Sequence, residues 1–265
     1  MQLGIVTYMI AAKWSLQKIL SVLGETRIRG VELRTTHAHG VEASLSPRER
    51  TAVRRMFEEA GVRPVGLGTA FEFDSPDPKV VRKNLEGAKQ YVELAHDIGA
   101  EGIKVRPNRL HEDKGIPAAA TLRQIGEALH ELGEYAQGFG VKVRVEVHGR
   151  GTSLLPNMKR IMDVANHPAV VVCWNCNRTD IDNPQAPPHA RSIRRNFGLV
   201  KRWVEIVHIH DLYDEQYPYG ELFELLKSMR FTGWTLAEIP ACHCDQDAVR
   251  LLRYYRALWQ RFARS

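Results

Sequence analysis

Short apolar runs alternate with longer amphipathic segments from one end of the chain to the other. Successive runs are spaced by roughly 30 residues, the length of one strand–helix unit. Eight such units within 265 residues predict an α/β protein with a single (β/α)8 TIM barrel. The predicted strands are Leu3–Met9, Gly30–Thr36, Pro64–Thr69, Gly102–Arg106, Lys142–His148, Val170–Asn175, Glu205–His210 and Trp234–Ile239.

The segments between these runs carry the signals of helix ends. Ser46, Pro47 and Glu49 supply an N-cap, a first-turn proline and a capping-box acid, and this helix is predicted to end near Gly61. Apolar residues at three- and four-residue spacing predict the other helices. These run from Asp77-Pro78 to Gly99, and over Thr121–Phe139, Met158–Ala165, Glu221–Met229 and Val249–Phe262.

A doubly wound sheet is the main rival to the barrel. It would usually carry a glycine-rich loop after its first strand, and Thr7–Lys13 contains no glycine. The proline-containing segment Asp180–Asn196, with Pro184, Pro187 and Pro188, is interpreted as a long barrel loop rather than a linker. We therefore expect residues 1–265 to form one domain.

Composition narrows the class of protein. Hydrophobic residues make up 44% of the chain and charged residues 26%. No apolar run is long enough to cross a bilayer, and the first residues lack the basic start and long apolar core of a secretory signal. We expect a cytoplasmic protein with no membrane partner.

The net charge of +6 comes from basic residues spread along the chain, apart from a run on the last predicted helix. The spacing of that run places several arginines on a solvated helix face, so no nucleic-acid partner is expected. Its members are Arg250, Arg253, Arg256, Arg261 and Arg264.

Polar residues gather where the later strands end, which is the active-site end of a TIM barrel. The two-residue alternation of a strand pairs Glu146 with His148, Cys173 with Asn175, His208 with His210, and Leu236 with Glu238. Four of these come from consecutive strands, and their carboxylate, imidazole and amide groups suit a divalent metal ion. The candidate ligands are Glu146, Asn175, His208 and Glu238.

Two other interpretations of these residues remain open. A buried glutamate is more often paired with a cation than with a metal, and Lys104, Arg106 and Arg144 are available for that. Cys173 and Cys176 form a C-x-x-C pattern, but residues three apart on a strand face opposite sides and cannot readily chelate one ion. We expect no functional cysteine pair.

Several motifs resemble the xylose isomerase-like TIM-barrel superfamily of the sugar phosphate isomerase and epimerase type. They are VEVH at 145–148, the HIHD segment that begins at His208, the YPYGELFELLK that follows, and GWTLAEIP near the end. The resemblance implies that Glu146, Asn175, His208 and Glu238 bind the metal. Asn175 stands where the superfamily usually has Asp, so the ligand set carries two negative charges rather than three. The alternative is that Asn175 binds a substrate hydroxyl.

The resemblance also implies a cofactor and an activity. One divalent ion is expected, with Mn²⁺ the first choice and Mg²⁺, Zn²⁺ or Co²⁺ as alternatives. Glu146 and Glu238 would move protons next to a metal-polarised carbonyl, through an enediolate, with His148 as a shuttle. This describes an isomerase or epimerase acting on a sugar or keto-sugar. Its substrate-binding residues would be Lys104, Arg106, Trp174 and His210.

Two other functions use the same residues. A lyase would eliminate a substituent from a 3-keto-glycoside after the same proton removal. A non-catalytic barrel would bind a sugar, and Asn175 is the main support for that view. A small-molecule carbohydrate is the expected partner in every case, with a homo-oligomer or a partner subunit as a further possibility.

Overall fold

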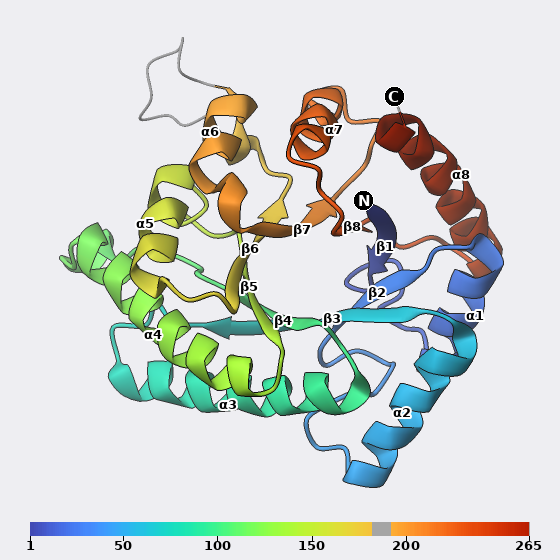
Figure 1. The fold of residues 1–265 in the computed structure, drawn as a ribbon, viewed down its shortest axis with the longest axis horizontal. Coiled ribbons are helices and arrows are strands. Elements are labelled where there is room, and N and C mark those ends of the chain that lie inside the picture. Colours follow the sequence, from blue (N-terminus) through green and yellow to red (C-terminus); the bar gives the residue numbers. More distant parts are fainter. Residues whose placement is uncertain (182–191, 265) are drawn as a thin grey trace.

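Eight parallel strands form a closed barrel in the order β1 to β8, and β1 pairs with β8 to close it. This computed structural model describes residues 1–181 and 192–264. The helices surround the strands as an outer ring (Figure 1). The prediction of a (β/α)8 TIM barrel is confirmed.

The strands are β1 (Gln2–Val6), β2 (Gly30–Arg34), β3 (Arg63–Glu72), β4 (Gly102–Arg106), β5 (Lys142–Glu146), β6 (Val170–Asn175), β7 (Val204–Ile209) and β8 (Trp234–Ala237). The α-helices are α1 (Leu16–Thr26), α2 (Pro47–Ala60), α3 (Pro78–Ile98), α4 (Ala118–Gly138), α5 (Leu155–Ala165), α6 (Ile193–Val200), α7 (Tyr219–Ser228) and α8 (Asp245–Arg264). Each strand overlaps its predicted run, with ends shifted by a few residues.

The helix-end signals that the sequence carries are used as predicted. Ser46 and Glu49 form a complete capping box at the start of α2, and Gly61 ends that helix with a left-handed φ of 61°.

The structure adds two helices that the sequence did not predict. The first, α1, is followed by Arg27, which adopts a left-handed φ of 55° at a position where glycine is usual.

The second added helix, α6, begins inside the segment that was interpreted as a loop. Ile193 and Phe197 are buried on its inner face. Residues 182–191, which include Pro184, Pro187 and Pro188, lie outside the described part of the chain.

Two apolar clusters divide the interior of the protein. The larger one fills the space between the strands and the ring of helices. The smaller one lies inside the barrel and consists of Val6, Val65, Cys173, Ile206, Trp234 and Leu236. Because this inner cluster is small, the remaining inward positions hold charged side chains, which must find partners away from water.

Two glycines allow close packing near the carboxyl ends of the strands. A Cβ atom at Gly68 on β3 would lie 2.8 Å from Oε1 of Glu32, so a larger residue would displace that carboxylate. Gly149 follows β5 with φ +94°, and a Cβ atom there would lie 1.4 Å from the carbonyl oxygen of Asn108. Gly149 therefore lets the loops after β4 and β5 pack closely together.

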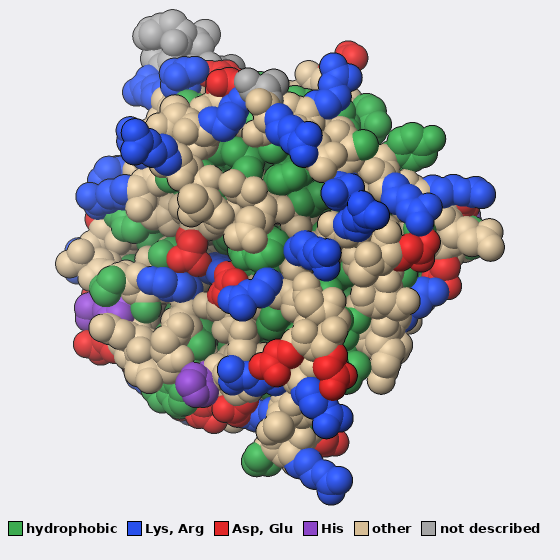
Figure 2. Space-filling model, turned by 45° about the vertical axis from the view of Figure 1, so that its right-hand side comes forward, with side chains coloured by type: hydrophobic (Ala, Val, Ile, Leu, Met, Phe, Trp, Pro, Cys, Tyr) green, Lys and Arg blue, Asp and Glu red, His purple; other side chains and the backbone are tan. Residues whose placement is uncertain are grey.

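Charged side chains are distributed over the outside. Figure 2 shows Lys and Arg spread across the visible face with Asp and Glu among them. On α8, Arg250 and Arg253 are exposed and pair with Asp247 and Glu25, as a solvated face predicts. Among the described helices, none combines the length and the apolar character that a membrane span requires.

A buried acid lies between β6 and α6. Asp180 is fully buried and accepts hydrogen bonds from the hydroxyl of Tyr217 at 2.7 Å and the amide of Asn177 at 2.8 Å. Its Oδ1 has no hydrogen-bond partner. Burial raises the pKa of Asp180 to about 8, although the two hydrogen bonds oppose the shift.

We predict that Asp180 makes stability fall as the pH rises. Because its pKa is raised on folding, the folded protein keeps a proton that the unfolded chain releases above about pH 4. The stabilisation is complete below that pH and is lost as the pH rises through about 8. Asp180→Asn removes this titration. The free energy of unfolding of the variant should therefore rise relative to that of the parent by up to about 1.4 kcal/mol for each pH unit within that window. Urea unfolding of both proteins across the pH range measures the gap, and a pH-independent gap would contradict the prediction.

Candidate metal centre

The four predicted ligands lie at the carboxyl ends of neighbouring strands. Glu146 is the last residue of β5 and Asn175 is the last residue of β6. Asn175 is in register with His208 on β7. Glu238 follows β8 directly, and its amide donates to the carbonyl oxygen of Ile209 at 2.9 Å, which holds it beside β7. The alternation that the sequence predicts thus brings all four to one side of the barrel mouth.

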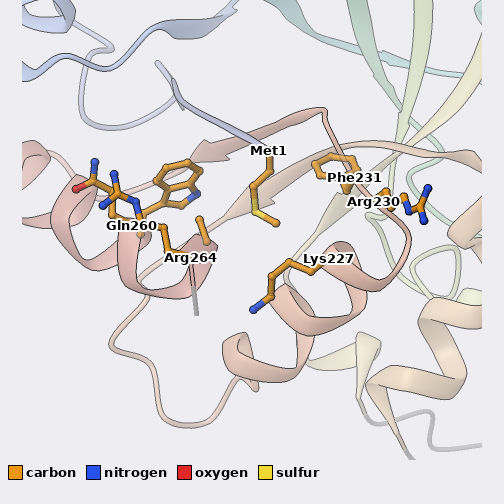
Figure 3. Close-up of a pocket in the computed structure, with 8 residues that line it drawn as sticks. Met1, Lys227, Arg230, Phe231, Gln260 and Arg264 are labelled. Atoms are coloured by element: carbon orange, nitrogen blue, oxygen red, sulfur yellow. The ribbon is translucent and has the colours of Figure 1, made fainter.

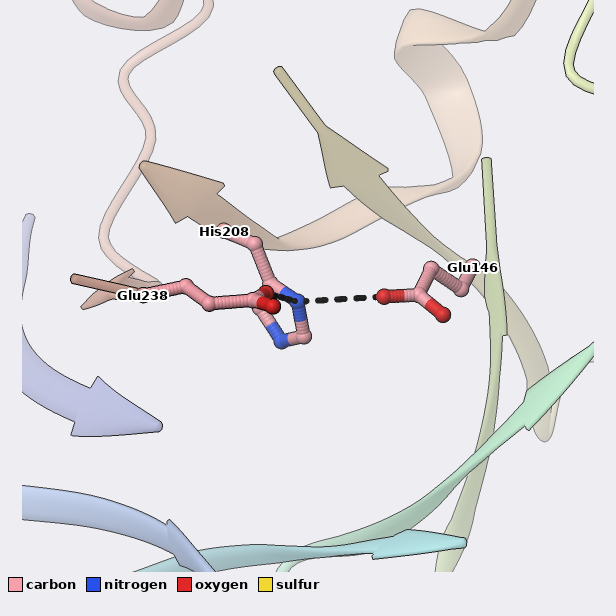
Figure 4. Close-up of side chains that lie close together, drawn as sticks. All are labelled: Glu146, His208 and Glu238. Atoms are coloured by element: carbon pink, nitrogen blue, oxygen red, sulfur yellow. Dashed lines mark ion pairs between the residues drawn. The ribbon is translucent and has the colours of Figure 1, made fainter. Parts of the chain in front are cut away.

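His208 stands between the two carboxylates. Its Nδ1 lies 3.3 Å from Oε1 of Glu146 and 3.4 Å from Oε2 of Glu238 (Figure 4). One ligand atom from each of the three residues falls within 4.8 Å of the others. Neither carboxylate is placed to form a hydrogen bond with Nδ1, which is buried and has no hydrogen-bond partner.

The other imidazole nitrogen has an acid partner. Nε2 of His208 lies 3.4 Å from Oε2 of Glu32, which is fully buried inside the barrel. A neutral His208 with its hydrogen on Nε2 would direct the Nδ1 lone pair toward Glu146 and Glu238, as metal binding requires. Metal-bound histidines are commonly held by a carboxylate in this way. An unpartnered nitrogen between two carboxylate oxygens is therefore a donor set that fits a divalent ion.

The charges of the site favour ionised ligands. Burial alone would raise the pKa of Glu146, but Lys104 and His208 hold it well below its usual range. The pKa of Glu238 is also lowered, because the effect of the nearby His208 outweighs that of burial. Burial opposes protonation of His208, yet its pKa is raised by Cys173, Glu32 and Glu146. Metal binding would then release a proton from this histidine.

Lys104 and Arg106 form the ion pairs that the sequence left open. Lys104 is buried, and its Nζ donates to Oε2 of Glu146 at 2.9 Å, which leaves Oε1 facing His208. Arg106 donates to Oε1 of Glu72 at 2.6 Å. Both cations still line the cavity above the centre. Each is therefore held in place by an acid and also presented toward bound ligands.

Asn175 and His210 contact each other at the rim of the centre. Nε2 of His210 lies 3.0 Å from Oδ1 of Asn175. An amide oxygen has two lone pairs, so this contact leaves one for another partner. Burial lowers the pKa of His210, and burial likewise lowers the pKa of His148. His148 keeps a buried Nδ1 with no hydrogen-bond partner, so it is free to bind or carry a proton as a neutral imidazole.

These residues line a polar cavity of about 250 Å³ at the barrel mouth. Seven predicted site residues contribute to it, namely Lys104, Arg106, Glu146, His148, Asn175, His210 and Glu238. Val6, Tyr8, Arg34 and Asn177 also line the cavity, and the sequence interpretation did not assign them to the site. The two-residue alternation places Val6 and Tyr8, Glu32 and Arg34, and Asn175 and Asn177 on shared faces, which is the signal that points to them.

The prediction that Trp174 binds substrate is wrong. Its ring is fully buried and faces the helices, with Nε1 donating to the hydroxyl of Tyr217 at 3.0 Å. The ring packs edge-on against the ring of Phe197, with the two ring centroids 5.2 Å apart. Because Cys173 and Asn175 face the barrel interior, alternation turns Trp174 outward.

The cysteines behave as the alternation predicts. Cys173 belongs to the cluster inside the barrel and Cys176 to the cluster outside it. Both are free thiols, and burial raises the pKa of each. They are therefore poor nucleophiles and do not form a pair.

A second cavity lies at the opposite end of the barrel, between the ends of α7 and α8. Figure 3 shows Met1, Lys227 and Phe231 around it. Its volume is about 450 Å³, and no acid or histidine is among the described residues that line it. It therefore lacks the donors that a metal centre needs.

The family of the chain follows from its sequence match. Residues 23–258 match the family of xylose isomerase-like TIM barrels, so the chain belongs to that family. A search of curated proteins gave no significant match.

Solved structures share this fold at low sequence identity. D-psicose 3-epimerase with D-tagatose, from Clostridium cellulolyticum H10, has a TM-score of 0.77 and 13% identity, over 100% of this chain and 98% of that chain. The IOLI protein with a binding zinc atom has a TM-score of 0.76 and 16% identity, over 99% and 98%. The E. coli 3-keto-D-glucoside 4-epimerase YcjR has a TM-score of 0.74 and 15% identity, over 96% and 99%.

We predict that Glu32 positions His208 for metal binding. Glu32→Gln removes the charge that holds Nε2, so Mn²⁺ affinity should fall by about 10-fold to 100-fold. Titration of Mn²⁺ by electron paramagnetic resonance measures the dissociation constant. Glu205→Gln is the matched control, because Glu205 pairs with Arg144 at the other end of the barrel. Equal Mn²⁺ affinity in Glu32→Gln and Glu205→Gln would contradict this role.

Proposed function

We propose that this protein is a divalent-metal-dependent isomerase or epimerase that acts on a sugar or keto-sugar, with residues 1–265 working as one domain. The observation that carries the proposal is the unpartnered Nδ1 of His208 between the carboxylates of Glu146 and Glu238, in a polar cavity at the barrel mouth. Similarity to D-psicose 3-epimerase and to YcjR, a 3-keto-D-glucoside 4-epimerase, supports this class of reaction.

The proposed cofactor is one divalent ion held by Glu146, Asn175, His208 and Glu238. Oxygen donors with one imidazole suit Mn²⁺ first, and also Mg²⁺, Zn²⁺ or Co²⁺. When bound, such an ion supplies Lewis-acid polarisation of a substrate carbonyl. The zinc atom in the structure of the IOLI protein supports a metal in this family.

Proton transfer is assigned to the two carboxylates. Their lowered pKa values keep Glu146 and Glu238 ionised near neutral pH, so either can accept a proton from the carbon next to the carbonyl. Glu146 comes from β5 and Glu238 follows β8, so they approach a substrate from different sides. One removes a proton from one face of that carbon. The other, once it has received a proton through His148, delivers it to the opposite face, which inverts the configuration and leaves the first carboxylate to release the proton it took.

Two histidines and two cationic side chains complete the assignment. His148, whose pKa burial lowers, serves as a proton shuttle or as a donor to a substrate hydroxyl. His210 holds the amide of Asn175 and can contact the same hydroxyl groups. Lys104 and Arg106 present their ammonium and guanidinium groups toward substrate oxygen atoms.

We predict that metal content follows the ligand set. The purified parent should hold about one divalent ion per chain after Mn²⁺ is supplied. Glu146→Gln should lose it, and Asn175→Asp should bind it more tightly because a third negative charge is added. Elemental analysis after dialysis measures this, with Glu101→Gln as a control outside the site. A parent that takes up no ion from Mn²⁺, Mg²⁺, Zn²⁺ or Co²⁺ would contradict the proposed centre.

We predict deuterium exchange at one substrate carbon. The Mn²⁺-loaded parent is incubated in D₂O with a panel of ketoses, aldoses and 3-keto-glycosides, and the products are followed by NMR. An isomerase or epimerase places deuterium next to the carbonyl in a product of unchanged mass apart from the label. Glu238→Gln should lower the rate by about 100-fold or more.

The same experiment separates the other functions. Release of a substituent from a 3-keto-glycoside would identify a lyase. Binding of the panel without exchange or release would identify a sugar-binding barrel and would contradict the proposed activity.

A further inference from the structure

Arg34 differs from the other cations of the cavity. It is the last residue of β2, is half-buried and lines the cavity. Lys104 is paired with Glu146 and Arg106 with Glu72. Within residues 1–181 and 192–264, no Asp or Glu forms an ion pair with Arg34.

The contacts of Arg34 hold only one edge of its guanidinium group. Nη1 donates to the carbonyl oxygen and the hydroxyl of Thr35, at 3.0 and 2.9 Å, and lies 3.4 Å from the carbonyl oxygen of Gly68. Glu42, farther along the same loop, accepts from the amide of Thr36 and the hydroxyl of Tyr91. The remaining donors of Arg34, on Nη2 and Nε, have no described acceptor. A guanidinium group anchored in this way is oriented for an incoming anion.

The charges around the cavity do not balance once an ion is bound. Four carboxylates, those of Glu32, Glu72, Glu146 and Glu238, lie in or directly behind it. A divalent ion together with Arg34, Lys104 and Arg106 brings five positive charges, with His208 neutral. One positive charge remains, and the cation without an acid partner is Arg34. An anionic ligand would supply the partner that the described acids do not.

The cavity is also divided by charge. Among the residues that line it, the cations Arg34, Lys104 and Arg106 come from β2 and β4, whereas the two carboxylates, Glu146 and Glu238, come from the end of β5 and from just after β8. In a closed eight-stranded barrel, β2 lies across the mouth from β6. A substrate with its carbonyl at the metal centre would therefore extend its other end toward Arg34.

We propose that the substrate carries an anionic group, a carboxylate or a phosphate ester, which Arg34 binds at the end distant from the reacting carbonyl. This inference rests on the proposed function and specifies its substrate class as sugar acids or sugar phosphates. A guanidinium group presents paired donors that match the oxygens of either anion. Arg34 is thus the residue that selects charged over neutral sugars.

The test compares three ligands of equal carbon number by isothermal titration calorimetry with the Mn²⁺-loaded full chain. They are ribitol, ribonate and ribitol 5-phosphate. The anions should bind about 10-fold or more tightly than ribitol, since a charge-assisted contact is gained. The preference should vanish in Arg34→Gln and persist in Arg63→Gln, which removes an exposed arginine outside the cavity. The tighter anion identifies which group the site takes.

Each other outcome overturns a separate claim. An anion preference that survives in Arg34→Gln would mean that the ion or Lys104 holds the anion, and would refute the role of Arg34. A parent that holds Mn²⁺ but shows no anion preference would refute the substrate class and leave the proposed centre standing. A parent without bound Mn²⁺ would contradict the proposed centre, and the effect of Arg34→Gln on ribonate binding would then be measured on the same ion-free protein.

Discussion

Charge compensation inside the closed barrel is the constraint on which the site depends. Barrel closure brings the inward residues of β2, β4, β5 and β7 together in one buried space. A buried charge there must find a partner, because removing one member of a buried pair costs about 3–5 kcal/mol. Lys104 with Glu146 and Glu32 with His208 meet this requirement. The same contacts fix the direction in which the ligand atoms point.

This arrangement explains how one set of residues serves both the fold and the proposed chemistry. Glu146 binds Lys104 through Oε2 and keeps Oε1 for the centre. His208 binds Glu32 through Nε2 and keeps Nδ1. Gly68 provides the space that lets Glu32 reach inward. Glu146 and His208 are thus each held by a contact on the far side, which is how metal centres are kept in position before the ion binds.

Much of this could be predicted from the sequence, because strand alternation is a local property. It placed Glu146, Asn175, His208 and Glu238 at one end of the barrel, although their roles remain predictions. Alternation should also have turned Trp174 outward, and its assignment as a substrate residue ignored that rule. The ion-pair partners could not be predicted from the sequence. Whether Lys104 pairs with Glu32 or with Glu146 depends on the strand register and on the room that Gly68 of β3 leaves for Glu32. The left-handed end of α1 at Arg27 gave no glycine signal.

The central claim is that the buried centre of Glu146, Asn175, His208 and Glu238 binds one divalent ion. The most direct measurement is an anomalous difference map from crystals of the full chain grown with Mn²⁺. The account predicts one strong peak within bonding distance of Nδ1 of His208 and of carboxylate oxygens of Glu146 and Glu238, with Asn175 beside it. A map with manganese peaks only elsewhere on the protein, or with none, would contradict it.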